Sequence, residues 1–169
     1  MLSRRGFLAG SVAAAALAPG FAPRAAKADT VPPPTGPILE ITGKITHSPQ
    51  SFDLTALKAL GDVSFKTSTP WDSGKSTFEG VPMDALMQKV GCTGEHVRAY
   101  GLDDYFVELP VSDFHQYGVL LAYKRNGSYL NVVARGPLWI VYPFDSKLIL
   151  DNNVYYGRSV WQLQRLDIS

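Results

Sequence analysis

Aromatic and polar side chains gather in three separated stretches of the sequence, each at a predicted turn or strand end. These stretches are Thr67 to Asp72, Asp103 to Tyr105, and Arg135 to Trp139. An aromatic ring buries a flat heterocycle well and orients it by stacking. A carboxylate accepts two parallel N–H bonds from an amidine-like edge, in the geometry that it also uses with arginine. Together the stretches suit a ligand with a fused ring that carries an amino group next to a ring N–H. Pterins have this pair of donors along one edge of the ring.

The stretch from Ala134 to Phe144 pairs a cation and a Gly136-Pro137 break with an apolar predicted strand. Glycine lets the backbone approach a ligand closely, and proline fixes the local geometry. Trp139 follows Leu138 by one residue, so the two side chains are expected on opposite faces of the strand. Trp139 is therefore either part of a small β-rich core or the wall of a cleft for a flat ligand.

Each of the other candidate residues has a structural and a functional interpretation. Trp71 stands in a polar loop, which favours exposure and a binding role. Trp161 is expected in the core, because most tryptophans are largely buried. Asp104, beside Tyr105, either shapes a turn or accepts hydrogen bonds from a ligand. Arg135 is either a solvated side chain or an anion contact beside the glycine-proline break.

Spacing argues against several familiar chemistries. The sequence Gly74-Lys75-Ser76 ends like a phosphate-binding loop, but Thr69 stands where the first glycine is needed. The three histidines have no spacing that would place two nitrogens on one metal. Cys92 is expected just past a helix C-terminus, where the dipole disfavours a thiolate, and is interpreted as a small apolar filler. We therefore predict neither catalytic residues nor a metal site.

The first 28 residues have the pattern of an export signal. A twin-arginine motif, Arg4-Arg5, precedes a mildly apolar run, and Ala26-Lys27-Ala28 forms a small-x-small cleavage site. The apolar run is shorter than the ~20 residues that span a bilayer. We predict export to the periplasm by the twin-arginine route, with no stable membrane insertion after cleavage. An uncleaved anchor is the alternative.

Length, charge and cysteine content limit the classes of protein to which the chain can belong. The chain of 169 residues has the length of one domain. Removal of residues 1–28 leaves twelve basic against fifteen acidic side chains, a formal charge of −3. A mildly acidic domain without runs of lysine or arginine argues against nucleic-acid binding. With Cys92 as its single cysteine, the chain forms no intramolecular disulfide.

The chain divides into the signal, a proline-rich linker over residues 29–37 and a domain over residues 38–169. Predicted strands cover 38–45, 63–67, 97–100, 105–109, 119–123, part of 134–144 and a closing stretch within 155–166. Predicted helices cover 54–60, capped by Asp53, and about 82–90, ended by Gly91. Residues 68–77 are expected to form a loop, and Asn126-Gly127 to turn a hairpin. Short strands with two short helices predict an α+β fold with a mixed or antiparallel sheet.

Several short motifs occur in the order found in one known family. They are Thr67-x-Thr69-x-Trp71, Phe78-x-Gly80-Val81-Pro82, Asp104-Tyr105, Leu121-Ala122, Asn126-Gly127, Gly136-Pro137-Leu138-Trp139 and Trp161-Gln162-Leu163. The chain resembles the small stand-alone proteins with the sulfite-oxidase-type molybdopterin-binding fold. The resemblance covers nearly everything after Pro37 and implies an α+β domain with a pterin-shaped cleft. In the larger enzymes a metal-binding cysteine follows the strand that corresponds to 63–67, where this chain has Thr67, Ser68 and Thr69. The resemblance therefore makes molybdenum ligation unexpected.

Some stand-alone members are periplasmic pterin-binding regulators that work with membrane enzymes of cyclic di-GMP metabolism. The resemblance to them implies a ligand-dependent regulator, more a binding protein than an enzyme. Its ligand would be a tetrahydropterin, with molybdopterin possible, and its partner the periplasmic domain of such an enzyme. The alternatives are a molybdopterin-dependent oxidoreductase and an interaction module without a small ligand. The expected pterin-binding residues are Thr67, Trp71, Asp104, Tyr105, Arg135, Gly136, Pro137 and Trp139.

Overall fold

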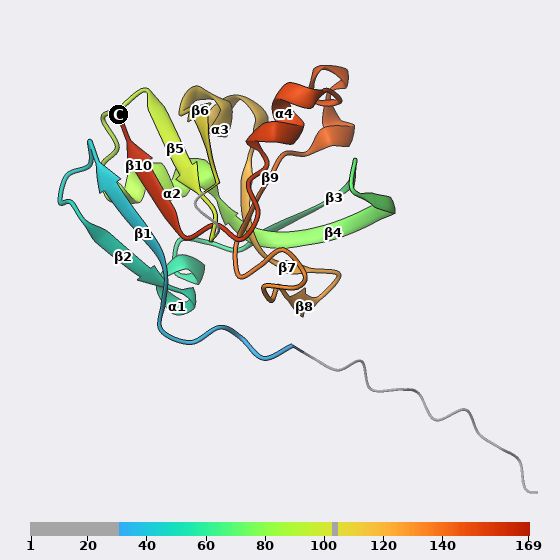
Figure 1. The fold of residues 1–169 in the computed structure, drawn as a ribbon, viewed down its shortest axis with the longest axis horizontal. Helices are drawn as coiled ribbons and strands as arrows, with labels where there is room; N and C mark the ends of the chain where they lie inside the picture. The colour runs from blue at the N-terminus through green and yellow to red at the C-terminus, as the bar shows by residue number, and fades with distance from the viewer. Residues whose placement is uncertain (1–30, 103–104) are drawn as a thin grey trace, which may run out of the picture.

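The domain is built from two five-stranded sheets in the computed structural model, which describes residues 31–102 and 105–169. The first sheet has the strand order β2-β1-β10-β5-β6, and the second has the order β3-β4-β7-β8 with β9 also paired to β7 (Figure 1). β1 and β10 run parallel, whereas the other paired strands run antiparallel. One mixed and one antiparallel sheet with short helices confirm the predicted α+β class.

The helices are short, and each follows a group of two or three strands along the chain. The strands are β1 (Pro37–Gly43), β2 (Gln50–Asp53), β3 (Val63–Thr69), β4 (Asp72–Pro82), β5 (His96–Tyr100), β6 (Phe106–Pro110), β7 (Leu120–Arg125), β8 (Ser128–Tyr129), β9 (Trp139–Val141) and β10 (Arg165–Ile168). The helices are α1 (Leu54–Lys58), α2 (Met83–Val90), α3 (Ser112–Tyr117) and α4 (Asn153–Arg158), with 3-10 turns η1 (Phe144–Ser146) and η2 (Leu148–Leu150).

The main core combines the inner faces of both sheets with α2. From the first sheet, β1 contributes Leu39 and Ile41, and β10 contributes Leu166 and Ile168. The second sheet contributes residues of β4, β7 and β9, and α2 buries Met83, Leu86, Met87 and Val90 against them. The spacing of these four residues gives α2 one apolar face, which packs into the core.

A second, smaller cluster lies on the other face of the β4-β7-β9 sheet. It consists of Phe78, Leu120, Ala122, Leu130, Trp139 and Val141, with Phe65 and Trp71 packed against it. Leu138 belongs to the main core and Trp139 to the second cluster, which confirms their predicted opposite directions. β9 is thus buried on both faces, and Trp139 has no exposed surface.

Local capping and turn predictions agree with the structure. The Asp53 carboxylate accepts the N–H of Ala56 at 2.7 Å and caps α1. Gly91 ends α2 in the left-handed region, at φ 62°. Asn126 and Gly127 both have positive φ, and they connect β7 to β8 as a two-residue hairpin turn.

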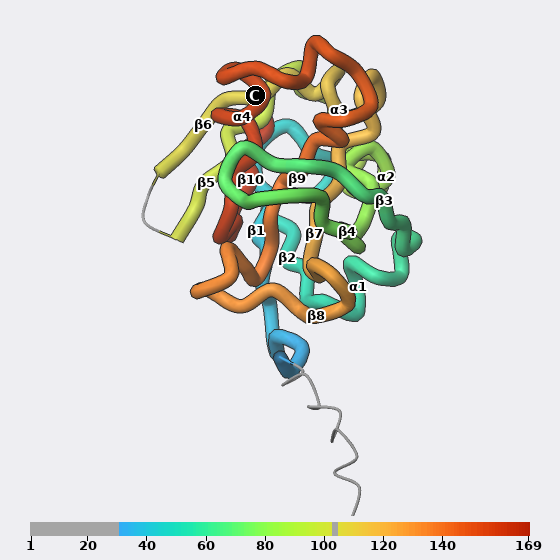
Figure 2. Tube along the Cα trace, turned by 90° about the vertical axis from the view of Figure 1, so that its right-hand side faces the viewer, coloured from blue at the N-terminus to red at the C-terminus, as the bar shows by residue number. Residues whose placement is uncertain are grey.

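Two predicted segments are wrong. Residues 68–77 form a hairpin rather than a loop, because β3 and β4 continue past the polar residues and leave only Pro70-Trp71 between them. This hairpin crosses the side of the molecule that faces the viewer in Figure 2. The closing strand, predicted within 155–166, is β10 and begins only at Arg165. The helix α4 takes the first part of the predicted stretch, with the Asn152 side chain accepting the N–H of Val154 at 2.8 Å. Asparagine is a preferred N-cap, and this signal outweighs the β propensity of the aromatic residues that follow.

The predicted export signal and the first two residues of the linker lie outside the described residues. Residues 31–36 lead into β1 without regular structure (Figure 1). Over residues 31–102 and 105–169, no helix has both the length and the apolar character needed to cross a membrane.

Candidate functional site

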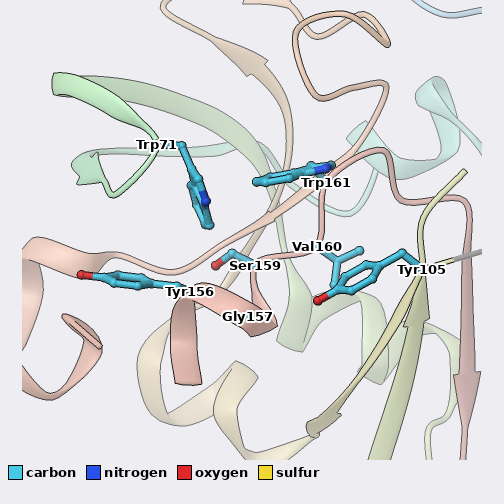
Figure 3. A pocket seen from close by; sticks show the side chains of 7 residues that line it. All are labelled: Trp71, Tyr105, Tyr156, Gly157, Ser159, Val160 and Trp161. Atoms are coloured by element: carbon cyan, nitrogen blue, oxygen red, sulfur yellow. The ribbon is translucent and has the colours of Figure 1, made fainter. Parts of the chain in front are cut away.

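A half-open pocket of about 340 Å³ lies between the β3–β4 turn and the segment that follows α4 (Figure 3). It is lined by Trp71, Tyr105, Tyr156, Gly157, Ser159, Val160 and Trp161. Its volume is at the lower end of the range for small-molecule sites, roughly 300–1,000 Å³. None of the seven lining residues has an ionic side chain, so the walls suit a flat, uncharged ring system.

Two tryptophans form a corner of this pocket. The ring centroids of Trp71 and Trp161 are 5.1 Å apart with an interplanar angle of 81°. Trp71 also contacts Tyr156, at 6.2 Å and 66°. Because Trp161 keeps 37% of its surface exposed, one indole wall is available to a ligand. The prediction that Trp161 belongs to the core is therefore wrong.

The helix α4, beside the pocket, is anchored by the buried carboxylate of Asp113. One oxygen of Asp113, Oδ2, accepts the Tyr142 hydroxyl at 2.8 Å and Nη1 of Arg158 at 2.7 Å. Burial, with Asp113 close by, raises the pKa of Tyr142 above its ordinary value. The Tyr155 hydroxyl donates to that of Tyr117 at 2.9 Å, which raises the pKa of Tyr155 to about 12. These contacts fix α4, whose last turn supplies part of the pocket wall.

A second charged network lies behind the pocket, around Asp72 at the start of β4. Its Oδ2 accepts hydrogen bonds from Nη1 of Arg135 at 2.7 Å and from the Thr69 hydroxyl at 3.1 Å, and it forms an ion pair with Nη1 of Arg125 at 3.2 Å. Burial raises the pKa of Asp72, but the two arginines and Thr69 outweigh it, so the pKa lies below 3.8. Asp72 is therefore the counter-ion of both arginines.

Of the predicted ligand-binding residues, the structure brings Trp71 and Tyr105 into the pocket. Trp139 lies behind Trp71, with ring centroids 5.8 Å apart, and is a core residue. Its indole Nε1 is buried without a hydrogen-bond partner in the described part of the chain. Arg135 stacks over Trp139 and Trp161 and does not line the pocket.

Gly136, Pro137 and Thr67 lie outside this pocket. Gly136 crosses the backbone of Leu130 so closely that an added Cβ would lie 2.4 Å from its carbonyl carbon. Pro137 follows a cis peptide bond and lines a different pocket, of about 330 Å³, beside β1. Thr67 is buried, and its hydroxyl accepts the N–H of Asp145 at 3.1 Å. Asp104 lies outside the described residues.

Sequence reasoning missed the residues contributed by α4 and the segment after it. These are Tyr156, Gly157, Ser159 and Val160. The signal that could have found them is Asn152, a preferred N-cap residue ahead of the aromatic pair that was assigned to a strand.

The described residues around the pocket supply no thiolate that could hold a metal. Cys92 is half-buried at the end of α2, where its Sγ lies 3.7 Å from the Gly94 carbonyl and packs against the main core. It is not among the pocket residues. In residues 31–102 and 105–169, no group of three or more His, Cys, Asp or Glu could hold a metal ion.

The hydroxyls of Ser68 and Thr69, at the end of β3, donate hydrogen bonds to carboxylates of the protein itself. Ser68 Oγ donates to Asp145 Oδ1 at 2.5 Å, and the Ser68 N–H donates to Oδ2 at 3.0 Å. Lys75 Nζ lies 3.0 Å from the same Oδ2. The Ser68 hydrogen bonds, followed by Lys75, lower the pKa of Asp145 to about 2. These residues hold the hairpin against η1 and offer no thiolate.

Fold and pocket together define an α+β domain with an aromatic pocket beside the β3–β4 hairpin. The chain belongs to the oxidoreductase molybdopterin binding domain family, whose model matches residues 37–145. Among solved structures, it is similar to the sulfane dehydrogenase SoxCD from Paracoccus pantotrophus, with 18% sequence identity and a TM-score of 0.59. That match covers 77% of this chain but 37% of the dehydrogenase chain, and at this identity it shows the fold alone. No curated protein matches the chain.

Proposed function

We propose that this domain binds a pterin-type bicyclic heterocycle in the pocket between Trp71 and Trp161. The observation that carries the proposal is the nearly perpendicular pair of indoles, one of them 37% exposed, at a pocket whose described lining residues include no ionic side chain. A flat ring stacks on one indole and meets the edge of the other, and both arrangements are favoured by the charge distribution of aromatic rings. Membership of a molybdopterin-binding family supports a pterin as the ring system.

The proposed binding does not use a thiolate-held molybdenum. Support comes from the position of Cys92, at the end of α2 and outside the pocket lining, and from the hydrogen-bonded hydroxyls of Thr67, Ser68 and Thr69. On this proposal the protein is a pterin-binding protein rather than a molybdenum enzyme, and a tetrahydropterin is the expected ligand.

A direct titration tests the proposal. Purified full-length protein is titrated with a tetrahydropterin and with molybdopterin, and binding is followed by the quenching of tryptophan fluorescence. We expect saturable binding that Trp161→Ala weakens and that Tyr129→Ala, a change on β8 outside the pocket, leaves intact. Absence of saturable binding to either compound would remove the proposal. A mass spectrum of any small molecule released on denaturation of natively exported protein would identify the ligand.

A molybdopterin-dependent oxidoreductase is the second candidate, and the family match favours it. The two candidates differ in metal content, which elemental analysis of natively expressed protein measures directly. Stoichiometric molybdenum would favour the oxidoreductase. Pterin without molybdenum would favour the binding protein.

The cellular role is a finer proposal: the protein acts in the periplasm as a pterin-dependent partner of a membrane enzyme of cyclic di-GMP metabolism. It is supported by the twin-arginine motif and by the resemblance to stand-alone regulators of this family. Capture experiments with the periplasmic domain of such an enzyme, with and without the pterin, test it. Equal capture in both conditions would argue against ligand-dependent regulation.

A further inference from the structure

The guanidinium of Arg135 is held between an acid and two indoles. Nη1 lies 2.7 Å from Asp72 Oδ2, and Cζ lies 5.2 Å from the ring centroid of Trp139 and 5.4 Å from that of Trp161. A cation within about 6 Å of an indole centroid is attracted to the ring. Arg135 therefore contacts one wall of the proposed pterin pocket from behind, although it does not line the pocket itself.

The backbone joins the same two segments. Arg135 has φ 68° and Gln162, next to Trp161, has φ 51°, and both values lie in the left-handed region that non-glycine residues rarely occupy. The Gln162 N–H donates to the Arg135 carbonyl at 3.0 Å, and Nε2 of Gln162 donates to the Val132 carbonyl at 2.8 Å. Strained conformations of this kind persist where the surrounding structure fixes them.

The position of Trp161 depends on these contacts. It lies outside the named helices and strands and forms a single isolated bridge with Trp139. Its indole meets Trp71 at 5.1 Å on the pocket side and is stacked by Arg135. Because it is 37% exposed, burial alone does not fix its orientation.

We infer that Arg135 is a positioning residue of the proposed pterin site: by stacking on Trp161 while Asp72 neutralises its charge, it holds this indole as the ligand-facing wall. The inference rests on the proposed function. It differs from the sequence-based expectation that Arg135 contacts an anionic part of the ligand. Arg135 acts on affinity through the indole and does not touch the ligand.

Arg125 provides a matched control. It also pairs with Asp72 Oδ2, at 3.2 Å, but its guanidinium lies over Phe78, at 6.0 Å. Arg135→Gln and Arg125→Gln each remove one positive partner of Asp72, and only the first removes the stacking on Trp161. We expect Arg135→Gln to weaken pterin binding roughly fivefold or more, on the scale of a partly desolvated cation–π contact. Arg125→Gln is expected to change the dissociation constant less than about twofold, since Phe78 is not a pocket residue.

A double-mutant cycle separates positioning from direct contact. If Arg135 acts through the indole, Arg135→Gln has no further effect on binding in a Trp161→Ala background. If its effect persists in full in that background, Arg135 contacts the ligand and the inference is overturned. Arg135→Lys keeps the charge but loses the planar group, and it is expected to bind with intermediate affinity. This variant also tests the inference if Arg135→Gln does not fold.

The ligand-free protein gives an independent readout. The indoles of Trp71, Trp139 and Trp161 should produce an exciton-coupled circular dichroism band, because their transitions interact at short distance. The Trp71–Trp161 pair is the closest, at 5.1 Å, against 5.8 Å for Trp71–Trp139 and 6.3 Å for Trp139–Trp161. We expect Arg135→Gln to reduce this band and Arg125→Gln to preserve it. An unchanged band in Arg135→Gln overturns the inference. If the wild-type protein binds no pterin, the proposed function fails, whereas the dichroism comparison still decides the role of Arg135.

Discussion

The indole of Trp71, at the tip of the β3–β4 hairpin, meets the indole of Trp161 edge to face, with centroids 5.1 Å apart. The first belongs to the middle of the chain and the second to its C-terminal part. Trp71 also packs edge-on against Phe144 and Tyr156. The pocket is therefore assembled by a contact between two distant segments, and several of the expected effects of mutation follow from it.

Replacement of Trp161 by alanine should weaken pterin binding about tenfold. An aromatic pair contributes about 0.5–1.5 kcal/mol beyond the area that it buries, and about 1.4 kcal/mol corresponds to a tenfold change in affinity. Because Trp161 is 37% exposed, the variant should remain folded. Fluorescence titration measures the affinity, with Tyr129→Ala as control. Equal losses in both variants would place the ligand outside the pocket.

Loss of the Arg158 guanidinium should destabilise the fold. The variant Arg158→Ala leaves the carboxylate of Asp113, which is 4% exposed, with the Tyr142 hydroxyl as its remaining hydrogen-bond donor among those described. Removal of one partner of a buried ion pair costs about 3 kcal/mol or more. Denaturant unfolding should show a decrease of this order in the free energy of unfolding. Arg98→Ala, which removes an exposed pair with Glu108, should leave that free energy almost unchanged.

Acid should weaken the contact between the β3–β4 hairpin and η1. The pKa of Asp145 is lowered from its ordinary value of 3.8 to about 2 by Ser68 and Lys75. A carboxylate with a lowered pKa stabilises the folded state fully above its unfolded-state pKa, and this contribution is lost as the pH falls. Free energies of unfolding should therefore fall between about pH 4 and pH 2 in the wild type, and less steeply in Asp145→Asn. Identical slopes of unfolding free energy against pH in the two proteins would show that Asp145 does not contribute to stability. Glu108→Gln, which changes an exposed carboxylate, serves as the control.

Glycine is required at position 136 for packing. A Cβ there would lie 2.4 Å from the carbonyl carbon and 2.5 Å from the carbonyl oxygen of Leu130, atoms that move only with the backbone. Gly136→Ala should lower the free energy of unfolding by about 1–3 kcal/mol, as overpacking does. Gly157→Ala is the matched control, because its Cβ would meet nothing within 4 Å. If both changes are tolerated equally, the close approach of the two segments is not rigid.

Local sequence determined much of the secondary structure. Alternation placed Leu138 and Trp139 on opposite faces, Asp53 capped α1, and Asn126-Gly127 closed the β7–β8 hairpin. These features depend on neighbouring residues and on backbone preferences, so a single stretch of sequence contains the required information. The ordered motifs also indicated the family, which the match over residues 37–145 shows.

The partners of the charged and aromatic side chains were decided by the tertiary structure. Arg135 pairs with Asp72 and is not among the residues that line the pocket. Trp161, which was expected in the core, is 37% exposed and forms a pocket wall. Such pairings join segments far apart in the chain, and their energies depend on distance, burial and counter-ions rather than on local pattern. The sequence by itself determined which residues were available for a pocket. The packing of the β3–β4 hairpin against the segment after α4 decided which of these residues face the pocket. The reason is that each side chain takes the position in which its charge is neutralised and its apolar surface is covered.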